Sequence, residues 1–294
     1  MASSDDCLGI CFVDHQLFYA VNDSSRQNFL SHIGSIDFNF AAKDAIDEPE
    51  NEDFNALGNS LLQLQGAYDC GTVRMLTPAL FECWSILPRL VYETPDERED
   101  HLSILLDAMP RNEVEATWFN LSNQDFKLLL VRNRQLTDVF RSLLTPFPNI
   151  DLVSEFELGM EWNRHTGTKG SYLTINCQPD HLAISSYLLG KLRGTTYIQL
   201  DSVNDLPYLW SYYGKELGWL NGIHDEVYVF GPLGMEVIEV MASFFSETGS
   251  IVLMNKLDTM GVEADETTYG FKLESSFPAI LLSLNTSVNS ELAH

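Results

Sequence analysis

The chain has 294 residues, and its 42 acidic and 17 basic side chains give it a formal net charge of −25. A surface this acidic repels phosphate backbones and anionic lipid, so we expect no nucleic-acid partner and no binding to a membrane surface. No apolar run approaches the roughly 20 residues that a bilayer-spanning helix needs, and we therefore expect no direct membrane insertion.

The N-terminus and the cysteines indicate a compartment. The opening "MASSDDCLGICF" carries acids and no basic residue before its apolar stretch, so it is not typical of a signal peptide. The cysteines are odd in number and scattered, which suits a reduced protein better than a disulfide scaffold. They are Cys7, Cys11, Cys70, Cys83 and Cys177. We expect a cytoplasmic protein.

The start of the chain predicts three consecutive strands. Residues 8–13 and 16–22 are short apolar runs rich in Val, Phe and Tyr, typical of a β-hairpin with its corner at Asp14 and His15. Residues 34–40 alternate polar and apolar side chains, as a half-buried strand does. A three-stranded meander is therefore expected.

The next segments alternate between helix and strand. Residues 53–66 place apolar side chains on one helical face, and residues 72–78 are typical of a strand that runs into a proline. Residues 78–91 are expected to form a short helix. Residues 93–122 begin like a charged helix and carry few strand signals, so we expect a small insert that packs on the first half.

The first half closes with two further units and a linker. Residues 125–133, "DFKLLLVRN", predict a strand, and residues 134–148 predict a helix that prolines end. Residues 149–167 begin as a strand and continue as a helix. "TGTKG", residues 166–170, is the best candidate for a linker.

The second half repeats this order of elements. Three strands are expected within residues 171–200, and the first corner between them carries a second Asp-His pair, Asp180 and His181. The elements that follow are a helix at 205–219, a strand at 226–232, a helix at 233–247, a strand at 250–255 and a closing helix at 277–288. Three strands, helix, strand, helix and strand thus occur twice, which indicates an internal duplication.

This duplicated order resembles the actin-like ATPase superfamily, in which two ribonuclease-H-like halves face each other across a cleft. The resemblance is carried by "QPDHLAISSYLLGKLRGTTYIQLDSVNDLPYLW", "DEVYVFGP" and "FPAILL", and by "LLLVRNRQLTDVFRSLL" as the matching close of the first half. Over almost its whole length the chain looks like a family of uncharacterised bacterial proteins of about this length. It is more distantly similar to the pilus-assembly actin-like proteins.

The resemblance implies an architecture. The expected fold is an α/β protein with two mixed five-stranded sheets, flanking helices and a small insert in the first half at about 93–122. In each sheet the second strand should run antiparallel to its neighbours. The first half would comprise residues 1–165 and the second half residues 166–294.

The same resemblance poses a question about ATP. An actin-like ATPase holds phosphate in both hairpin corners, where glycine lets backbone N–H groups approach. Here the corners read "FVDHQLF" and "INCQPDHLA" and contain no glycine. Pro179 lacks an N–H, and His15, Gln16, Cys177 and Gln178 put side chains where phosphate would lie. We therefore expect no catalytic residue, no cofactor and no bound metal.

An alternative function remains open. The chain would then be an ATP-dependent enzyme similar to sugar or acetate kinases, with Asp14 and Asp180 at the cofactor. The two Asp-His pairs also allow two interpretations, either as turn formers or as an acid–base pair across the cleft. The missing glycines favour the non-catalytic protein with turn-forming corners.

Aromatic side chains favour a protein partner, either another protein or a second copy of this chain. The stretch "YLWSYYGKELGWL" concentrates Tyr and Trp on one predicted helix, and such residues are enriched at interface hot spots. Core packing is the other explanation for them. The candidate partner-binding residues are Tyr208, Tyr212 and Trp219, with Trp118 and Phe119 of the insert. Relatives in pilus assembly and secretion hold a peptide of a membrane partner on their first half, which implies an adaptor function by analogy.

Overall fold

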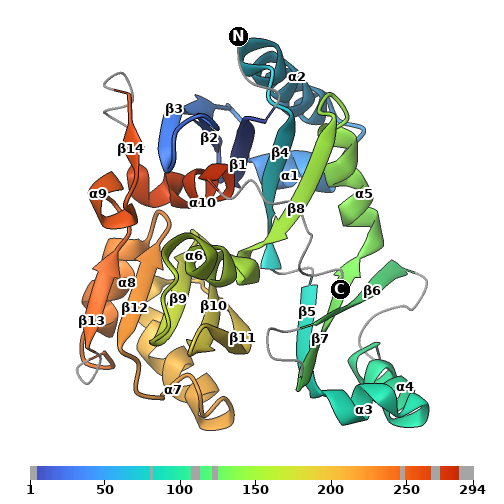
Figure 1. The fold of residues 1–294 in the computed structure, drawn as a ribbon, viewed down its shortest axis with the longest axis vertical. Coiled ribbons are helices and arrows are strands. Elements are labelled where there is room, and N and C mark those ends of the chain that lie inside the picture. Colours follow the sequence, from blue (N-terminus) through green and yellow to red (C-terminus); the bar gives the residue numbers. More distant parts are fainter. Residues whose placement is uncertain are drawn as a thin grey trace.

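A computed structural model describes residues 5–79, 82–106, 113–120, 125–245, 249–265 and 272–284. These residues form three β-sheets with helices on their faces (Figure 1). Two of the sheets lie one above the other, and the third belongs to a smaller part beside the second sheet.

The first large sheet begins with the expected meander. Strands β1 (Cys7–Val13), β2 (Gln16–Asn22) and β3 (Phe29–Asp37) pair antiparallel in that order. On the other side of β1, β4 (Thr72–Thr77) and then β8 (Asn149–Ser154) run parallel to it. The second strand is thus antiparallel to its neighbours, as predicted.

The second large sheet has the same plan. Strands β9 (Ser171–Cys177), β10 (His181–Leu188) and β11 (Lys191–Gln199) form an antiparallel meander. Strands β12 (Glu226–Phe230) and β13 (Ser250–Leu253) continue the sheet parallel to β9. The order β11-β10-β9-β12-β13 matches β3-β2-β1-β4-β8, so the predicted duplication is confirmed.

The expectation of two five-stranded sheets is wrong for the first sheet, which has six strands. The additional strand is β14 (Glu263–Ala264), which follows the short helix α9 (Leu257–Met260) and pairs parallel with β3. The backbone N–H of Glu263 also donates to the Asn28 carbonyl over 3.0 Å. A strand from the second half therefore covers an edge of the first sheet that would otherwise expose unpaired backbone groups.

The insert is larger than predicted and contains a sheet of its own. Strands β5 (Glu82–Pro88), β7 (Phe126–Asn133) and β6 (Val114–Asn120) form an antiparallel three-stranded sheet in that spatial order. Two helices, α3 (Arg89–Glu93) and α4 (Pro95–Leu106), connect β5 to this sheet's other strands along the chain. The helix predicted at 78–91 is therefore mostly strand, and the strand predicted at 125–133 belongs to the insert.

Burial on both faces of β7 explains the misplaced strand. Leu129 and Val131 pack with Leu87 and Leu106 inside the insert. Leu128 faces the opposite way and joins the large core between the sheets. A strand covered on both faces is a continuous apolar run, and such a run does not reveal which sheet it joins.

Helices cover the outer faces of both large sheets. The first sheet is covered by α1 (Ala42–Asp47), α2 (Glu52–Tyr68) and α5 (Arg134–Leu143) through Leu57, Leu61 and Phe140. The second sheet is covered by α7 (Leu206–Glu216), which follows the 3-10 turn η4 (Val203–Asp205), and by α8 (Gly234–Met241). The helix predicted at 53–66 thus corresponds to α2.

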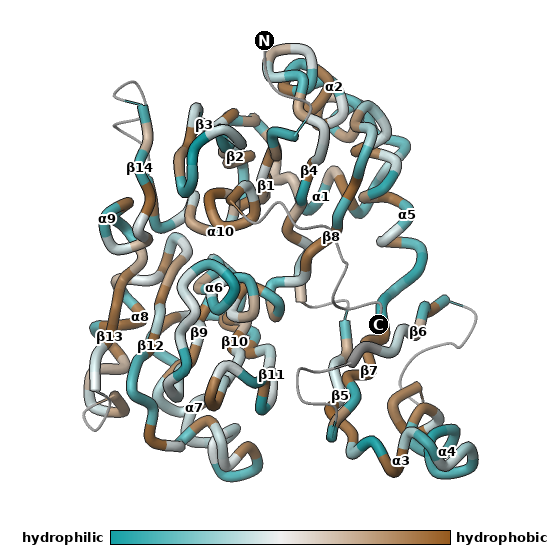
Figure 2. Tube along the Cα trace, viewed as in Figure 1, coloured by the Kyte–Doolittle hydropathy of each residue, from teal (hydrophilic) through white to brown (hydrophobic). Residues whose placement is uncertain are grey.

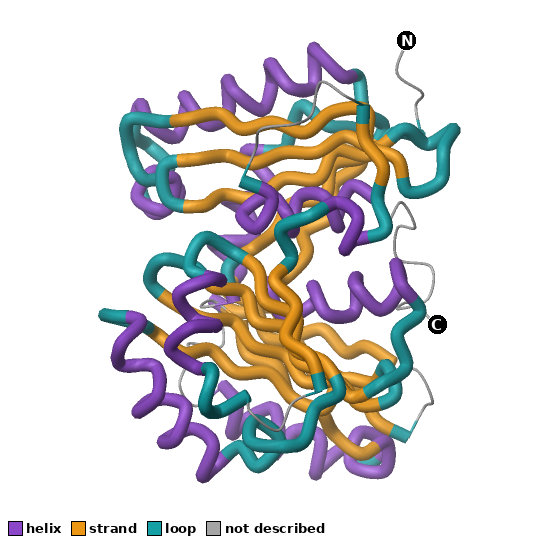
Figure 3. Tube along the Cα trace, turned by 90° about the vertical axis from the view of Figure 1, so that its left-hand side faces the viewer, coloured by secondary structure: helices purple, strands orange, loops and turns teal. Residues whose placement is uncertain are grey.

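Two closing helices lie between the sheets. Helix α10 (Leu273–Leu284), the last described element, packs on β1, β2 and β4 of the first sheet. Helix α6 (Leu158–Thr166) packs on β9, β10 and α10. Figure 2 shows α10 as largely hydrophobic, as a helix buried between two layers must be. Figure 3 shows the two sheets stacked with helices between them and outside them.

Each half's closing helix packs on the sheet of the other half, and this packing joins the two halves. Helix α10 ends the second half in sequence, yet it packs on the first sheet, and it approaches β1 so closely that a Cβ on Gly9 would lie 2.0 Å from the Ala279 carbonyl oxygen. The boundary between residues 165 and 166 stays a prediction. Residues 285–288 of the predicted closing helix lie outside the described part of the chain.

Candidate functional site

The two hairpin corners line one cavity between the halves. This cavity measures ≈ 250 Å³ and is lined by Asp14 from the β1–β2 corner, by Asp180 and His181 from the β9–β10 corner, and by one face of α1. The duplication therefore brings the two Asp-His corners to a common cleft, where the resemblance places nucleotide.

The first corner is a tight turn held by its own backbone. Asp14 has a φ of 51°, a left-handed conformation that Asp tolerates better than most residues. The carbonyl of Asp14 accepts a hydrogen bond from Ala42 N over 2.9 Å, and that of His15 accepts one from Phe38 N over 2.8 Å. The corner thus anchors the start of α1, and Asp14 and His15 both have exposed side chains, 3.4 Å apart.

The second corner is filled by side chains and a proline. The N–H of Gln178 closes the turn by donating to the His181 carbonyl over 2.9 Å, and Pro179 has no N–H to offer. The Gln178 side chain is buried and donates to Asn176 Oδ1 over 3.1 Å. These two residues therefore supply no backbone donor to a phosphate in the cavity.

His181 is held between two carboxylates. Its Nδ1 lies 2.7 Å from Asp180 Oδ1, and its Nε2 lies 3.0 Å from Glu155 Oε2. Its ring stacks on Tyr197 with a centroid separation of 4.7 Å. Burial by itself would lower the pKa of His181, but the charge of Glu155 and the hydrogen bond to Asp180 raise this pKa to about 9. The ring is therefore an imidazolium at neutral pH.

Glu155 links both halves at the floor of the cleft. It begins the 3-10 turn η3 (Glu155–Glu157) after β8 and is only 5% exposed. Its carboxylate accepts hydrogen bonds from Ala79 N in the first half and from Asn176 Nδ2 in the second half, each over 2.8 Å. Sequence reasoning missed Glu155. The detectable signal was the capping box of Ser154 and Glu157, which marks the turn on which Glu155 lies.

Lys43 reaches across the cleft. Its Nζ lies 3.2 Å from Asp180 Oδ2, with both side chains about half exposed. The hydrogen bond between the His181 ring and Asp180 is the largest of the causes that lower the pKa of Asp180, burial opposes it, and Lys43 lowers this pKa further. Since Lys43 follows Ala42, whose N–H bonds to Asp14, one lysine side chain spans from the first corner to the second.

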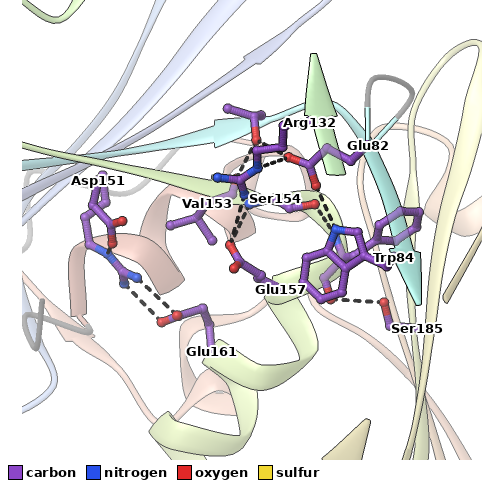
Figure 4. Close-up of polar contacts among 12 residues, drawn as sticks. Glu82, Trp84, Arg132, Asp151, Val153, Ser154, Glu157, Glu161 and Ser185 are labelled. Carbon is purple, nitrogen blue, oxygen red and sulfur yellow. Dashed lines mark hydrogen bonds and ion pairs between the residues drawn. The ribbon is translucent and has the colours of Figure 1, made fainter. Parts of the chain in front are cut away.

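A second polar cluster lies where the insert meets β8 and α6 (Figure 4). Arg132 Nε donates to Glu82 Oε1 over 2.7 Å, and Trp84 Nε1 donates to Glu82 Oε2 over 3.0 Å. Glu157 lies beside Arg132, and its burial raises its pKa to about 7 even though the Arg132 charge opposes this. The contacts of Glu82 join strands β5 and β7 within the insert, and the ion pair between Arg132 and Glu157 connects the insert to the turn after β8.

The same cluster continues to the buried arginine of β4. Arg74 is 3% exposed; its Nε donates to Asp151 over 2.8 Å and its Nη1 donates to Glu161 over 3.0 Å. Arg74 also donates to the Leu282 carbonyl of α10 over 3.4 Å. Because each charge is paired, the cluster reads as a structural connection among β4, β8, α6 and α10.

The aromatic candidates separate into exposed and packed residues. Tyr208 and Tyr212 of α7 are 73% and 52% exposed. Trp219 is half-buried against the second-half core and lies close to Gly194. Trp118 is half-buried with its ring 5.1 Å from that of Tyr92, and the side chain of Phe119 lies outside the described structure. Only the two tyrosines are both described and exposed.

The described residues contain neither a metal-binding cluster nor a membrane-spanning helix. No group of three or more His, Cys, Asp or Glu side chains there is arranged to hold a metal ion. Within the same residues, no helix combines the length and the apolar character needed to cross a membrane.

Comparison with known proteins identifies the class of fold. A Bacteroides thetaiotaomicron protein with an actin-like ATPase fold and unknown function matches with a TM-score of 0.53 and 13% identity, over 85% of this chain and 91% of that chain. The PilM–PilN type IV pilus biogenesis complex contains a chain that matches with a TM-score of 0.62 and 10% identity, over 95% and 98%. The cytoplasmic domain of EpsL, an inner-membrane component of the Vibrio cholerae type II secretion system, matches with a TM-score of 0.52 and 10% identity, over 96% of both chains.

The chain therefore has the actin-like ATPase fold, as its resemblance implied. No protein-family model matches it, and its sequence matches no curated protein. At these identities the structural similarity defines the fold and leaves the function to be inferred from the site.

Proposed function

We propose that the chain is a non-catalytic actin-like protein, with a degenerate nucleotide site, that acts as a protein-binding adaptor in the cytoplasm. The degenerate nucleotide site is inferred from the residues that form the two hairpin corners. Asp14, Gln178 and Pro179 line the cavity where an actin-like ATPase needs glycines. Their Cβ atoms and the missing N–H of Pro179 weaken any phosphate cradle.

Electrostatics supports the same conclusion. The cavity is lined by five carboxylates and two cations, Lys43 and the imidazolium of His181. The five carboxylates are Asp14, Asp44, Asp47, Glu155 and Asp180. The balance is negative, so a polyphosphate entering the cleft meets repulsion that is stronger there than in bulk water because the walls are apolar.

The adaptor function is supported by analogy and by one exposed feature. Two proteins of the same fold are components of larger assemblies, one in complex with PilN and one in a secretion system. In this chain Tyr208 and Tyr212 expose their rings on one helix of an otherwise acidic protein. A partner with apolar and basic residues would bury these rings, and the acidic surface would raise its association rate.

Two experiments test the two parts separately. Isothermal titration with magnesium-ATP should give no saturable binding up to about millimolar concentration, and a well-defined isotherm would refute the degenerate site. For the adaptor, a photo-reactive phenylalanine analogue at position 208 should crosslink one discrete protein in the native cell, whereas the same analogue at the exposed Phe126 of the insert should not.

The crosslinked protein then allows a quantitative test. Its affinity for the purified chain should fall about 5- to 150-fold in Tyr208→Ala or Tyr212→Ala, since interface anchors contribute roughly 1–3 kcal/mol. Phe126→Ala serves as the matched control and should leave the affinity unchanged. If neither tyrosine variant weakens binding to the crosslinked protein or to a second copy of the chain, the adaptor surface on α7 is excluded.

A further inference from the structure

The cleft has the walls of a ligand site. Its ≈ 250 Å³ far exceeds the roughly 10–15 Å³ that one buried water requires. Most of its wall is apolar, formed by Phe12, Ala42, Ile46, Phe140, Pro179 and Tyr197. A mostly apolar cleft with a few polar groups is the usual form of a small-molecule site.

The polar groups of this cavity favour a cation. On the α1 side the rim carries Asp14, Asp44 and Asp47, all exposed. On the opposite side Asp180 and Glu155 hold His181 between them. With His181 charged, the lining carries three more negative than positive charges. Acids of the first corner and α1 and the acid of the second corner thus line one mostly apolar cleft. A ligand that pairs with both groups of acids needs two positive charges separated by an apolar body.

The chain itself shows that an alkylammonium fits. The Lys43 ammonium lies 3.2 Å from Asp180 Oδ2, which is within the range of an N–H···O hydrogen bond. The lysine backbone lies directly beside the first corner, since the preceding residue bonds to the Asp14 carbonyl. A four-carbon chain with one ammonium is therefore long enough to connect the rim near Asp14 to Asp180.

We propose that the cleft binds a small linear aliphatic diamine with a four- or five-carbon chain. One ammonium replaces that of Lys43 on Asp180, and the other lies at the rim formed by Asp14, Asp44 and Asp47. The methylene chain packs on Phe12, Ile46 and Tyr197. The inference goes beyond the adaptor function and does not depend on Tyr208 or Tyr212, so either proposal can fail alone.

The test is calorimetric titration of the full chain with 1,5-diaminopentane and 1,4-diaminobutane at about 0.15 M salt, where long-range screening suppresses diffuse binding to the acidic surface. The diamines should give a saturable one-site isotherm. 1-Aminopentane, which has the same apolar body and one ammonium, should bind at least about 10-fold more weakly, because a hydrogen bond between charged groups contributes on the order of 1.5–3 kcal/mol.

Three variants locate the site. Asp180→Asn should weaken diamine binding about 10-fold or more. Lys43→Met keeps an unbranched side chain only one atom shorter and removes the competing ammonium, so this variant should bind the diamine more tightly than the unmodified chain. Asp258→Asn, at an exposed acid of α9 that does not line the cleft, is the matched control and should bind as the unmodified chain does.

The outcomes decide the proposal. Unchanged secondary structure and melting temperature in Lys43→Met and Asp180→Asn show that each variant is folded. Should either unfold, the other variant still carries the test, because the two are expected to shift affinity in opposite directions. Absence of a saturable isotherm, or equal weakening in Asp180→Asn and Asp258→Asn, would overturn the diamine site.

Discussion

Glu155 Oε2 lies 3.0 Å from His181 Nε2, so a residue of the first half holds the imidazolium of the second half's corner. The same oxygen accepts the Ala79 N–H over 2.8 Å. One of the two contacts that Glu155 makes with the second half therefore depends on a charge that disappears at high pH, and the other is the hydrogen bond from the Asn176 amide.

The first prediction concerns this charge. The pKa of His181 is raised to about 9 in the folded chain, against an ordinary value of about 6.5. The folded state therefore holds the proton more tightly, and the resulting stability is fully present below pH 6.5 and is lost as pH rises to about 9. We expect the free energy of unfolding to fall by on the order of 3 kcal/mol across this window.

Urea unfolding at pH 6, 7.5 and 9 measures how the free energy of unfolding changes with pH. His181→Gln removes the group that titrates near pH 9 and should flatten the dependence between pH 7.5 and 9, whereas His32→Gln, at an exposed histidine of β3, should leave it unchanged. A wild-type profile that is already flat between pH 6.5 and 9 would contradict the prediction.

The second prediction is that Glu157 also makes the free energy of unfolding fall as pH rises, over a lower pH range than His181. Burial raises the pKa of Glu157 to about 7, from an ordinary value of about 4.3. The folded chain then binds more protons than the unfolded chain between these values, so stability falls as pH rises through them. Glu157→Gln should remove this slope, and its amide oxygen can still accept the Ser154 N–H. The exposed Glu52→Gln is the control, and an unchanged slope in Glu157→Gln would refute the assignment.

The sequence predicted the repeated strands because each had its own local pattern. Residues 8–22 and 171–200 are short apolar runs separated by turn formers, and the order of the helices and strands after them repeats. The two residues of β14 carry no such pattern and are a strand only because β3 is adjacent to them. The insert's sheet was missed because β5 and β6 are half-buried and lack clear alternation.

The candidate site was partly predictable for the same reason. Asp14 and Asp180 occur in corners whose symmetry is visible in the sequence, and they do line one cavity. Glu155 and Lys43 were not recognised because their partners lie far away along the chain: His181 is 26 residues from Glu155 and Asp180 is 137 residues from Lys43. Only the packing of one half on the other brings them together.

The third prediction tests the close packing of α10 on strand β1 of the first sheet. A Cβ on Gly9 would lie 2.0 Å from the Ala279 carbonyl oxygen and 2.7 Å from Ser283 N. Both are backbone atoms of α10, so relieving the clash would require the helix itself to shift. Gly9→Ala should therefore lower the free energy of unfolding by about 1–3 kcal/mol or more. Gly66→Ala, on α2 with nothing within 4 Å of its Cβ, should instead stabilise by roughly 0.5–1 kcal/mol. Denaturant titration of both variants measures the difference, and equal effects would contradict this packing.

The fourth prediction concerns Arg74, which is 3% exposed and bound to Asp151, Glu161 and the Leu282 carbonyl. Arg74→Met removes a paired charge and leaves the buried carboxylate of Glu161 without this partner, for which a loss of about 3–5 kcal/mol is expected. The exposed pair Arg89–Glu93 provides the control, because Arg89→Met should cost less than about 1 kcal/mol.

A double variant separates the loss of packing from the loss of charge pairing at this site. After Arg74→Met the buried Glu161 carboxylate keeps Arg164 as a cationic partner but has lost Arg74. Adding Glu161→Gln neutralises this carboxylate, so the double variant should be more stable than Arg74→Met alone even though it carries one more substitution. Guanidinium unfolding of the four chains in the cycle measures this coupling. If the double variant is less stable than Arg74→Met by the full cost of Glu161→Gln, the two side chains are not coupled. The connection between β4 and α6 would then not depend on the Arg74–Glu161 ion pair.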